Sequence, residues 1–278
     1  MSTVDRKQLI VGYHNDVRRS RHGTRNWCWP SNGGGDGRRP PHGIGHATAQ
    51  RYAEEGWAVV VLDMNGEGVT SAAETIAEDT GAQVAAYAVD VTNREQVFDT
   101  AKRIAASDLP PVGALANVAG IPSPVPFLEV TPQLWDRVIA VNLTGVFNTC
   151  QAFLPAMIDG GYGRIVNMSS VSAQQGGGVF SKTPYSAAKA GVLGLTRSLA
   201  REMAPQGITV NAICPAVVAT DIRAGNSAED EERLTATIPM RRQGTGRDIA
   251  NLYVWLSSED AGYVTGTTQS INGGAYIA

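Results

Sequence analysis

The chain has 278 residues, of which 43% are hydrophobic and 18% are charged, and its formal net charge is −3 at pH 7. This size and composition predict a globular protein with one substantial core. The small net charge gives no reason to expect a nucleic-acid partner. No apolar run reaches about 18 residues, so no membrane span is predicted either.

The cysteines indicate the redox compartment of the protein, and residues 1–7 bear on whether it carries a signal peptide. Residues 1–7 lack the apolar segment of a signal peptide. The three cysteines, Cys28, Cys150 and Cys214, are odd in number and lack the spacing of a metal site. We therefore expect a reduced, cytoplasmic protein without a bound metal.

Beyond residue 43 the sequence alternates between apolar runs and helical patterns. Ala58–Leu62 is continuously apolar, as expected for a strand covered on both faces. Thr131 fits a helix N-cap, with Pro132 at the first helical position. The predicted helices span residues 46–56, 67–80, 93–106, 131–158, 184–203 and 248–256, and the predicted strands span residues 58–62, 83–89, 113–118, 164–169, 209–213 and 268–271. This alternation predicts an α/β fold, a single-domain, doubly wound parallel sheet of the Rossmann-like kind.

Tyr185 and Lys189 stand four residues apart and follow the serine pair Ser169 and Ser170, which ends an apolar run. Positions four apart share one face of a helix, so the phenol and the ammonium point into the same space. Since a nearby cation favours phenolate, we expect Lys189 to lower the pKa of Tyr185 from about 10. A tyrosine so tuned exchanges a proton with an alcohol or a carbonyl near neutral pH. The same spacing also arises by chance on many helices that have no catalytic role.

The serine pair followed by Tyr-x-x-x-Lys resembles the active-site pattern of the short-chain dehydrogenase/reductase family. The resemblance covers roughly residues 43–278. It implies a nicotinamide cofactor, a small-molecule substrate, and interconversion of a secondary alcohol and a ketone. In that pattern Tyr185 is the general acid/base and Ser170 polarises the substrate oxygen. Lys189 tunes Tyr185 and binds the nicotinamide ribose, and Asn142 holds a water beside the lysine.

One of these assignments depends on sequence register. Ser172 is an alternative to Ser170, because the loop at residues 174–180 varies in length across the family. We prefer Ser170, since it lies nearer the end of the strand, where the family places this hydroxyl.

The residues expected to bind the cofactor follow the ends of the predicted strands, where doubly wound sheets bind ligands. Asp63 directly follows the predicted strand at residues 58–62, the second strand of the family's fold, where a carboxylate accepts hydrogen bonds from the adenosine ribose and repels a 2′-phosphate. This favours NAD over NADP, although a lone aspartate also serves simply to cap a strand exit. By resemblance, the other cofactor contacts are Gly43, Ile44, Gly45, Asp90, Val91, Asn117, Ala119, Gly120, Pro215, Val218 and Thr220, together with Tyr185 and Lys189.

Two of the cofactor motifs carry a second interpretation. The motif of Asn117 also stabilises the sheet in this family, so a structural role is equally expected. Ala216 stands where the family usually has glycine, and alanine is costly there if the backbone needs a positive φ.

The substrate is less well defined by the sequence. Three glycines at residues 176–178 and few charges near the site favour a small polar alcohol, while a polyol or sugar and a 3-oxoacyl thioester stay open. The polar segment at residues 221–242 resembles the family's lid over the substrate, or is a solvated surface helix. The resemblance also implies a homo-oligomer, a tetramer or a dimer, formed through the helices at residues 131–158 and 184–203.

Residues 1–42 form an atypical N-terminal segment. The family's Thr-Gly-x-x-x-Gly-x-Gly loop, which cradles the cofactor pyrophosphate, is matched only at its end by residues 43–45. Arg39 stands where an earlier glycine is expected, and residues 13–42 are rich in arginine, histidine, tryptophan and glycine.

Three interpretations of residues 13–42 stay open. In the first they form a divergent phosphate-binding loop built on residues 32–37. In the second they form a basic arm for an anionic partner. In the third, which we favour, they result from a shifted reading frame, and residues 8–11 are what remains of the first strand. If the segment abolishes cofactor binding, the chain is a dehydrogenase-like scaffold without turnover.

Overall fold

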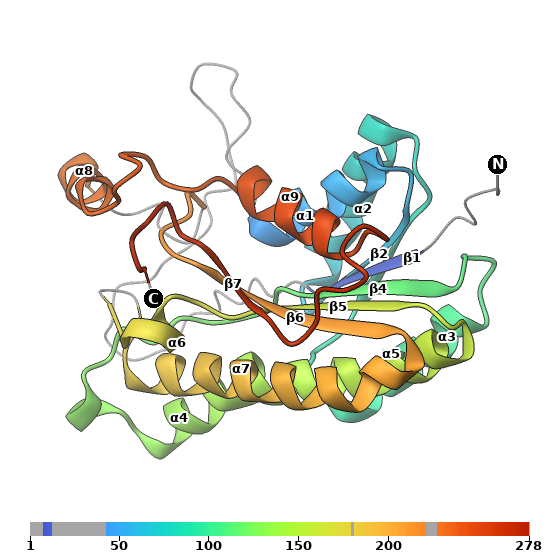
Figure 1. Ribbon diagram of the computed structural model, residues 1–278, viewed down its shortest axis with the longest axis horizontal. Helices are drawn as coiled ribbons and strands as arrows, with labels where there is room; N and C mark the ends of the chain where they lie inside the picture. The colour runs from blue at the N-terminus through green and yellow to red at the C-terminus, as the bar shows by residue number, and fades with distance from the viewer. Residues whose placement is uncertain (1–7, 13–42, 179–180, 221–226, 278) are drawn as a thin grey trace.

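The structure is a computed structural model that describes residues 8–12, 43–178, 181–220 and 227–277. The described strands form one seven-stranded parallel sheet in the order β3-β2-β1-β4-β5-β6-β7 (Figure 1). The strands are β1 (Gln8–Gly12), β2 (Ala58–Asp63), β3 (Val84–Ala88), β4 (Val112–Asn117), β5 (Gly163–Met168), β6 (Ile208–Pro215) and β7 (Thr268–Ile271). The predicted doubly wound parallel sheet is confirmed. Its strand order reverses between β1 and β4, the place where such sheets bind ligands.

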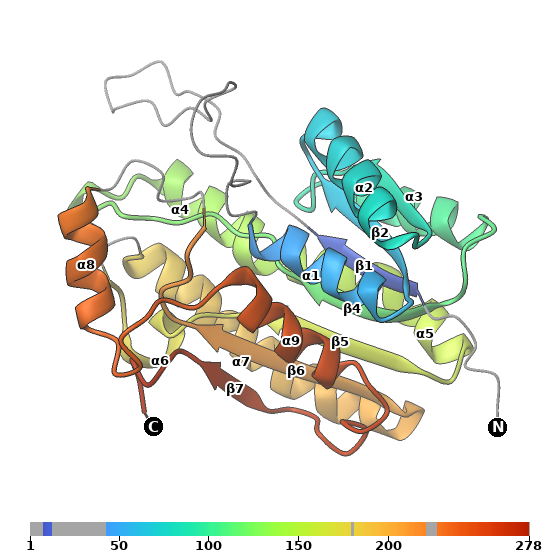
Figure 2. The same ribbon diagram turned by 90° about the horizontal axis from the view of Figure 1, so that it is seen from above.

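Helices cover both faces of the sheet. They are α1 (Ile44–Glu54), α2 (Gly66–Thr80), α3 (Arg94–Ala105), α4 (Pro132–Ile139), α5 (Gly145–Asp159), α6 (Ser172–Gln175), α7 (Thr183–Met203), α8 (Ala228–Ala236) and α9 (Gly246–Leu256), with short 3-10 turns at Phe127–Glu129 and Ala204–Gln206 and a π-helical turn at Ala140–Thr144. In Figures 1 and 2, α1, α2 and α9 lie on one face, and α3, α5 and α7 lie on the other.

Alternation along the strands divides the core into two parts. In β1, Leu9 and Val11 pack with residues of α1, α2 and α9, while Ile10 packs with residues of α3, α5 and α7. All three side chains are fully buried. A strand whose side chains are buried on both faces is expected at the centre of a parallel sheet, which explains why its sequence is continuously apolar.

The first strand lies in the atypical N-terminal segment. β1 pairs in parallel with β2 on one side and with β4 on the other. A domain boundary at residue 43 therefore leaves out a central strand, and the fold includes residues 8–12 as well. The interpretations that concern residues 13–42 fall outside the described residues.

The predicted helix over residues 131–158 is interrupted. Thr131 caps α4 by accepting a hydrogen bond from the Leu134 amide at 3.2 Å, as expected, and Pro132 takes the first helical position. The π-helical turn Ala140–Thr144 then separates α4 from α5. A π turn inserts one extra residue into the helical ladder and is common at functional sites. Hydrophobic periodicity alone does not reveal such an insertion.

The segment Pro132–Asp159 is long and apolar enough to cross a membrane by length and composition, and 56% of its most apolar window is buried within the protein. Phe153 and Met157, on α5, are buried in the core beneath the sheet. Core helices pass the same test of length and composition. We attribute the apolar character of this segment to its packing against β4 and β5.

Candidate active site

The predicted catalytic residues meet at the carboxyl end of β5. Ser170 follows this strand, and Tyr185 and Lys189 lie on the first turns of α7, which packs against β5 and β6. The Tyr185 side chain is hydrogen-bonded to Ser170. The Lys189 Nζ atom lies 5.7 Å from the centre of the Tyr185 ring and donates a hydrogen bond of 2.8 Å to the Met168 carbonyl. The structure thus brings these three side chains together at one place.

The pKa values differ from the sequence expectation. Burial raises the pKa of Tyr185 to about 12, although part of the side chain stays exposed, and the hydrogen bond from Ser170 offsets only some of this rise. Burial lowers the pKa of Lys189 to about 8. The prediction that the pKa of Tyr185 lies below its ordinary value is therefore wrong, because burial raises it. Desolvation is the largest effect on the pKa of this phenol, so Tyr185 holds its proton at neutral pH.

Asn142 lies in the π-helical turn, next to the lysine. Its Nδ2 atom donates to the Ile121 and Val138 carbonyls at 3.0 Å each, while its buried Oδ1 atom has no hydrogen-bond partner among the described residues. A Cβ atom placed on Gly120 would lie 2.7 Å from this oxygen and 3.3 Å from Lys189 Nζ. The absence of a side chain at Gly120 thus lets the amide oxygen and the ammonium both lie close to this part of the backbone. A water between them would have two polar partners, as the predicted proton path requires.

The two candidate serines have different partners. Ser170 Oγ accepts a hydrogen bond of 3.1 Å from the Ser172 amide and bonds to Tyr185. The Ser172 hydroxyl is instead paired with the Ser181 hydroxyl at 2.7 Å. The geometry therefore favours Ser170 as the group that contacts the substrate oxygen.

The predicted cofactor residues lie along the carboxyl edge of the sheet. Asp63 ends β2, is 5% exposed, and accepts a hydrogen bond of 2.8 Å from the Asn65 amide. Asp90 follows β3 and accepts two hydrogen bonds from Thr92, while the buried Val91 offers its carbonyl to Asn148. Each carboxylate therefore helps to shape the turn after its strand, and a ligand contact would come in addition.

The side chain of Asn117 mainly stabilises the sheet. Its Nδ2 atom donates to Asn167 Oδ1 at 2.8 Å, and its Oδ1 atom accepts from the Thr149 hydroxyl at 2.7 Å. Asn167 in turn donates to the Thr196 hydroxyl at 3.0 Å. The network ties β4 and β5 to α5 and α7, so the side chain of Asn117 fits its structural interpretation. Ala119, nearly buried, and Gly120 follow it along the same edge.

The segment after β6 follows the same edge. Pro215 ends the strand, and Val218 forms a single parallel bridge with Gly244. Thr220 follows, partly exposed. Arg241 is the one residue other than glycine with a positive φ among those described. The φ angle of Ala216 is therefore not positive, and alanine causes no backbone strain at this position.

Helix α1 begins at the residues that end the glycine motif. Gly43 is its N-cap, followed by Ile44 and the buried Gly45. A Cβ atom added to Gly43 would meet no atom of the described residues within 4 Å. The first amides of a helix favour an anion, so this end is suited to a pyrophosphate. Together with Asp63 at the end of β2, these residues fit a dinucleotide cofactor.

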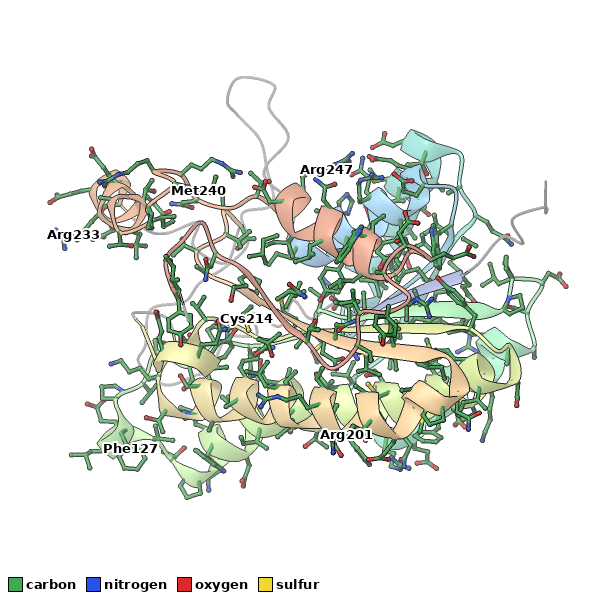
Figure 3. The ribbon with its side chains drawn as sticks, in the orientation of Figure 1. Phe127, Arg201, Cys214, Arg233, Met240 and Arg247 are labelled. Atoms are coloured by element: carbon green, nitrogen blue, oxygen red, sulfur yellow. The ribbon has the colours of Figure 1, made fainter. Side chains whose placement is uncertain are left out.

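Sequence reasoning did not assign a role to Cys214, which lies on β6 close to the catalytic groups. Figure 3 shows its side chain at the end of β6 between the sheet and α6. Burial raises the pKa of this thiol, and a hydrogen bond with Ser169 acts in the opposite direction. A lone cysteine in the sequence gives no indication that its side chain lies close to the catalytic groups. No group of three His, Cys, Asp or Glu side chains that could hold a metal occurs within the described ranges.

Comparison with known proteins identifies the family of this chain. A family model described as enoyl-(acyl carrier protein) reductase matches residues 37–276. The chain belongs to the short-chain dehydrogenase/reductase family. An acetoacetyl-CoA reductase of Rhizobium meliloti is 42% identical over 237 residues, which are 85% of this chain and 95% of that protein. A 3-oxoacyl-[acyl-carrier-protein] reductase of Staphylococcus aureus is 39% identical over 238 residues, 84% of this chain and 94% of that protein.

A solved structure shows the same fold. The crystal structure of a 3-oxoacyl-[acyl-carrier protein] reductase from Brucella melitensis superposes with a TM-score of 0.81 and 29% identity, covering 99% of this chain and 92% of that one. The chain is therefore an oxidoreductase that acts on carbonyl or alcohol groups with a nicotinamide cofactor.

Proposed function

We propose that this chain interconverts a 3-oxoacyl compound and the matching 3-hydroxyacyl compound, with NAD preferred over NADP. The observation that carries the proposal is the hydrogen-bonded pair of Ser170 and Tyr185 beside Lys189 at the carboxyl end of β5. Among the substrate classes left open by the sequence, the 3-oxoacyl class is supported by the printed activities of the relatives from Rhizobium meliloti and Staphylococcus aureus.

The residues act on the substrate oxygen. The nicotinamide cofactor supplies the hydride that reduces the carbonyl carbon. Tyr185, protonated because burial raises its pKa to about 12, gives its proton to the carbonyl oxygen, and the Ser170 hydroxyl hydrogen-bonds the same oxygen. Lys189 replaces the proton of Tyr185, and Asn142 Oδ1 accepts from a water that links the lysine to solvent. In the oxidising direction the proton moves the opposite way.

The preference for NAD rests on Asp63. Its buried carboxylate at the end of β2 would accept hydrogen bonds from the adenosine ribose and would repel a 2′-phosphate. We further propose a cytoplasmic homo-oligomer. Exposed apolar side chains on α4 and α5, at Trp135, Phe147 and Ile158, support contact between copies of this chain through these helices.

The test is a titration of the purified protein with NADH and NADPH, followed by nicotinamide fluorescence, and then assays with acetoacetyl-CoA. We expect tighter binding of NADH, and about tenfold loss of that preference in Asp63→Ser, the size of one lost hydrogen bond to a charged group. Turnover that fails in spite of cofactor binding would refute the 3-oxoacyl assignment. Failure to bind either cofactor would instead favour the scaffold without turnover.

A further inference from the structure

The catalytic hydroxyl of Ser170 is held by a neighbouring backbone amide. Its Oγ atom accepts a hydrogen bond of 3.1 Å from the Ser172 amide, and the Ser170 side chain is also hydrogen-bonded to Tyr185. A serine oxygen has one hydrogen to donate and two lone pairs with which to accept. Because the amide occupies one lone pair, it restricts the directions in which the Ser170 hydroxyl can point. The position of the Ser172 amide therefore affects where the catalytic hydroxyl donates.

The Ser172 amide lies at the start of α6, a helix of four residues. A helix this short is not stable by itself, because its first turn fixes many backbone torsions for very few hydrogen bonds. Helix α6 thus depends on contacts with the rest of the chain. The Ser172 hydroxyl is hydrogen-bonded to the Ser181 hydroxyl at 2.7 Å. Gln174, on the same helix, donates to the Ser270 hydroxyl at 3.2 Å.

Ser181 is in turn held through its backbone. It forms a parallel bridge with the fully buried Ser123, and the next amide, that of Lys182, donates to the Ser123 carbonyl at 2.8 Å. The Ser181 carbonyl accepts a hydrogen bond of 2.6 Å from the Gly178 amide. A Cβ atom added to Gly177 would clash with the same carbonyl oxygen. The hydroxyl that pairs with Ser172 therefore comes from a part of the chain that is fixed from two sides.

This chain of contacts leads from a fixed backbone segment to the catalytic hydroxyl. We propose that Ser172 and Ser181 are positioning residues for Ser170. The hydroxyl pair holds Ser172 in place, and the Ser172 amide then directs the Ser170 hydroxyl towards the substrate oxygen. Neither Ser172 nor Ser181 contacts the substrate in this arrangement. The inference rests on the proposed function and adds to it two residues that act through the catalytic serine.

The two paired hydroxyls differ in exposure, so their removal has unequal consequences. Ser172 is 6% exposed, whereas Ser181 is partly exposed. Ser181→Ala leaves a buried hydroxyl without its partner, which costs free energy until the hydroxyl finds another acceptor. Ser172→Ala instead leaves the hydroxyl of Ser181, which water can reach. We therefore expect the larger loss of activity in Ser181→Ala.

The first test measures kcat for the reduction of acetoacetyl-CoA by NADH. We expect kcat to fall about tenfold in Ser181→Ala and about fivefold in Ser172→Ala, with the affinity for NADH unchanged. The double variant should lose no more than Ser181→Ala, because both substitutions remove the same hydrogen bond. Losses that multiply in the double variant would show that the two hydroxyls act independently, and would overturn the inference.

A second cycle shows whether the effect passes through Ser170. In a Ser170→Ala background, Ser181→Ala should change kcat less than about twofold, since the hydroxyl that it positions is already absent. A further tenfold loss in that background would assign Ser181 a merely structural role and overturn the inference.

Two variants serve as controls for the substitution of serine. Ser181→Thr keeps a hydroxyl at this position and should retain most of the activity. Ser198→Ala removes an exposed hydroxyl on α7 that donates to Glu202 at 3.0 Å, and it should leave kcat unchanged.

Hydrogen exchange provides a measurement that is independent of turnover. The Ser172 amide is protected by its bond to Ser170, and mass spectrometry of a peptide covering residues 169–176 follows its exchange. We expect about tenfold faster exchange in Ser181→Ala. Unchanged exchange would overturn the inference whatever the activity. Faster exchange in a protein that does not reduce acetoacetyl-CoA would count against the proposed function and leave the positioning of Ser170 standing.

Discussion

Two junctions between a strand and the next helix differ sharply in this chain. Only Met64 and Asn65 separate β2 from α2, and Asn65 caps the helix by accepting a hydrogen bond from Gly68. In contrast, residues 13–43 separate β1 from α1. Both strands nevertheless pair side by side in the same register of the sheet. Because the entropic cost of a loop grows only slowly with its length, the sheet tolerates a long connection at a position where the family has a short one.

The difference teaches that fold and cofactor binding depend on different residues. The position of β1 depends on five buried residues between β2 and β4, of which Leu9, Ile10 and Val11 are apolar. A pyrophosphate cradle depends instead on the backbone amides at the start of α1, which directly follows the connection. The catalytic groups on β5 and α7 are far along the chain from this junction, so the two functions can be tested separately.

The largest expected effect comes from the catalytic side. Tyr185→Phe removes the proton donor and should lower kcat about 10²- to 10⁴-fold, the usual contribution of general acid–base catalysis. The affinity for NADH should change little, as fluorescence titration would show. Tyr263→Phe is the matched control, because Tyr263 is fully exposed. Equal activity of the two variants would remove Tyr185 from the mechanism.

Lys189 provides a test through pH. Burial lowers its pKa to about 8 in the folded protein, against an ordinary value of 10.5. Between these values the unfolded chain binds more protons, so the free energy of unfolding should rise with pH by about 3 kcal/mol relative to Lys189→Met. Denaturant unfolding measures the free energy of unfolding of both proteins between pH 7.5 and 10.5. Subtracting one curve from the other removes the contribution of Tyr185 and of the other ionisable groups that both proteins share. Parallel curves would mean that Lys189 is not desolvated as described.

The sequence predicted the parallel sheet well, because continuous apolar runs depend on local residues. The spacing of four also predicted that Tyr185 and Lys189 lie close together on one helix, as they do on α7. It did not reveal the π-helical turn that positions Asn142, since the extra residue is determined by packing. It also gave the wrong direction for the Tyr185 pKa, because burial depends on segments distant in the sequence.

Replacing the connection tests the N-terminal side. Substituting residues 13–42 with a short Thr-Gly-x-x-x loop that runs into Gly43 would restore the family pattern. We expect the affinity for NADH to rise about 10- to 100-fold, since hydrogen bonds to a charged phosphate contribute about 1.5–3 kcal/mol each. Fluorescence titration measures this change. Unchanged affinity would show that residues 13–42 already supply the cradle, as in the divergent-loop interpretation.

The smallest expected effect sharpens the geometry on the catalytic side. Gly120→Ala places a methyl group 2.7 Å from Asn142 Oδ1 and 3.3 Å from Lys189 Nζ. Overpacking of this kind costs about 1–3 kcal/mol, because the buried amide and the ammonium must both shift. The methyl group also takes the space of the water in the proposed proton path, so kcat should fall more than KM rises. Thermal unfolding and steady-state kinetics measure the two effects.

Gly194→Ala is the matched control for this substitution. Gly194 is exposed on α7, and an added Cβ atom there meets nothing within 4 Å. Alanine in a helix is more favourable than glycine by roughly 0.5–1 kcal/mol, so this variant should be slightly more stable and equally active. If Gly120→Ala behaved in the same way, the space beside Asn142 would have no role in proton transfer. The buried amide oxygen would then need another partner.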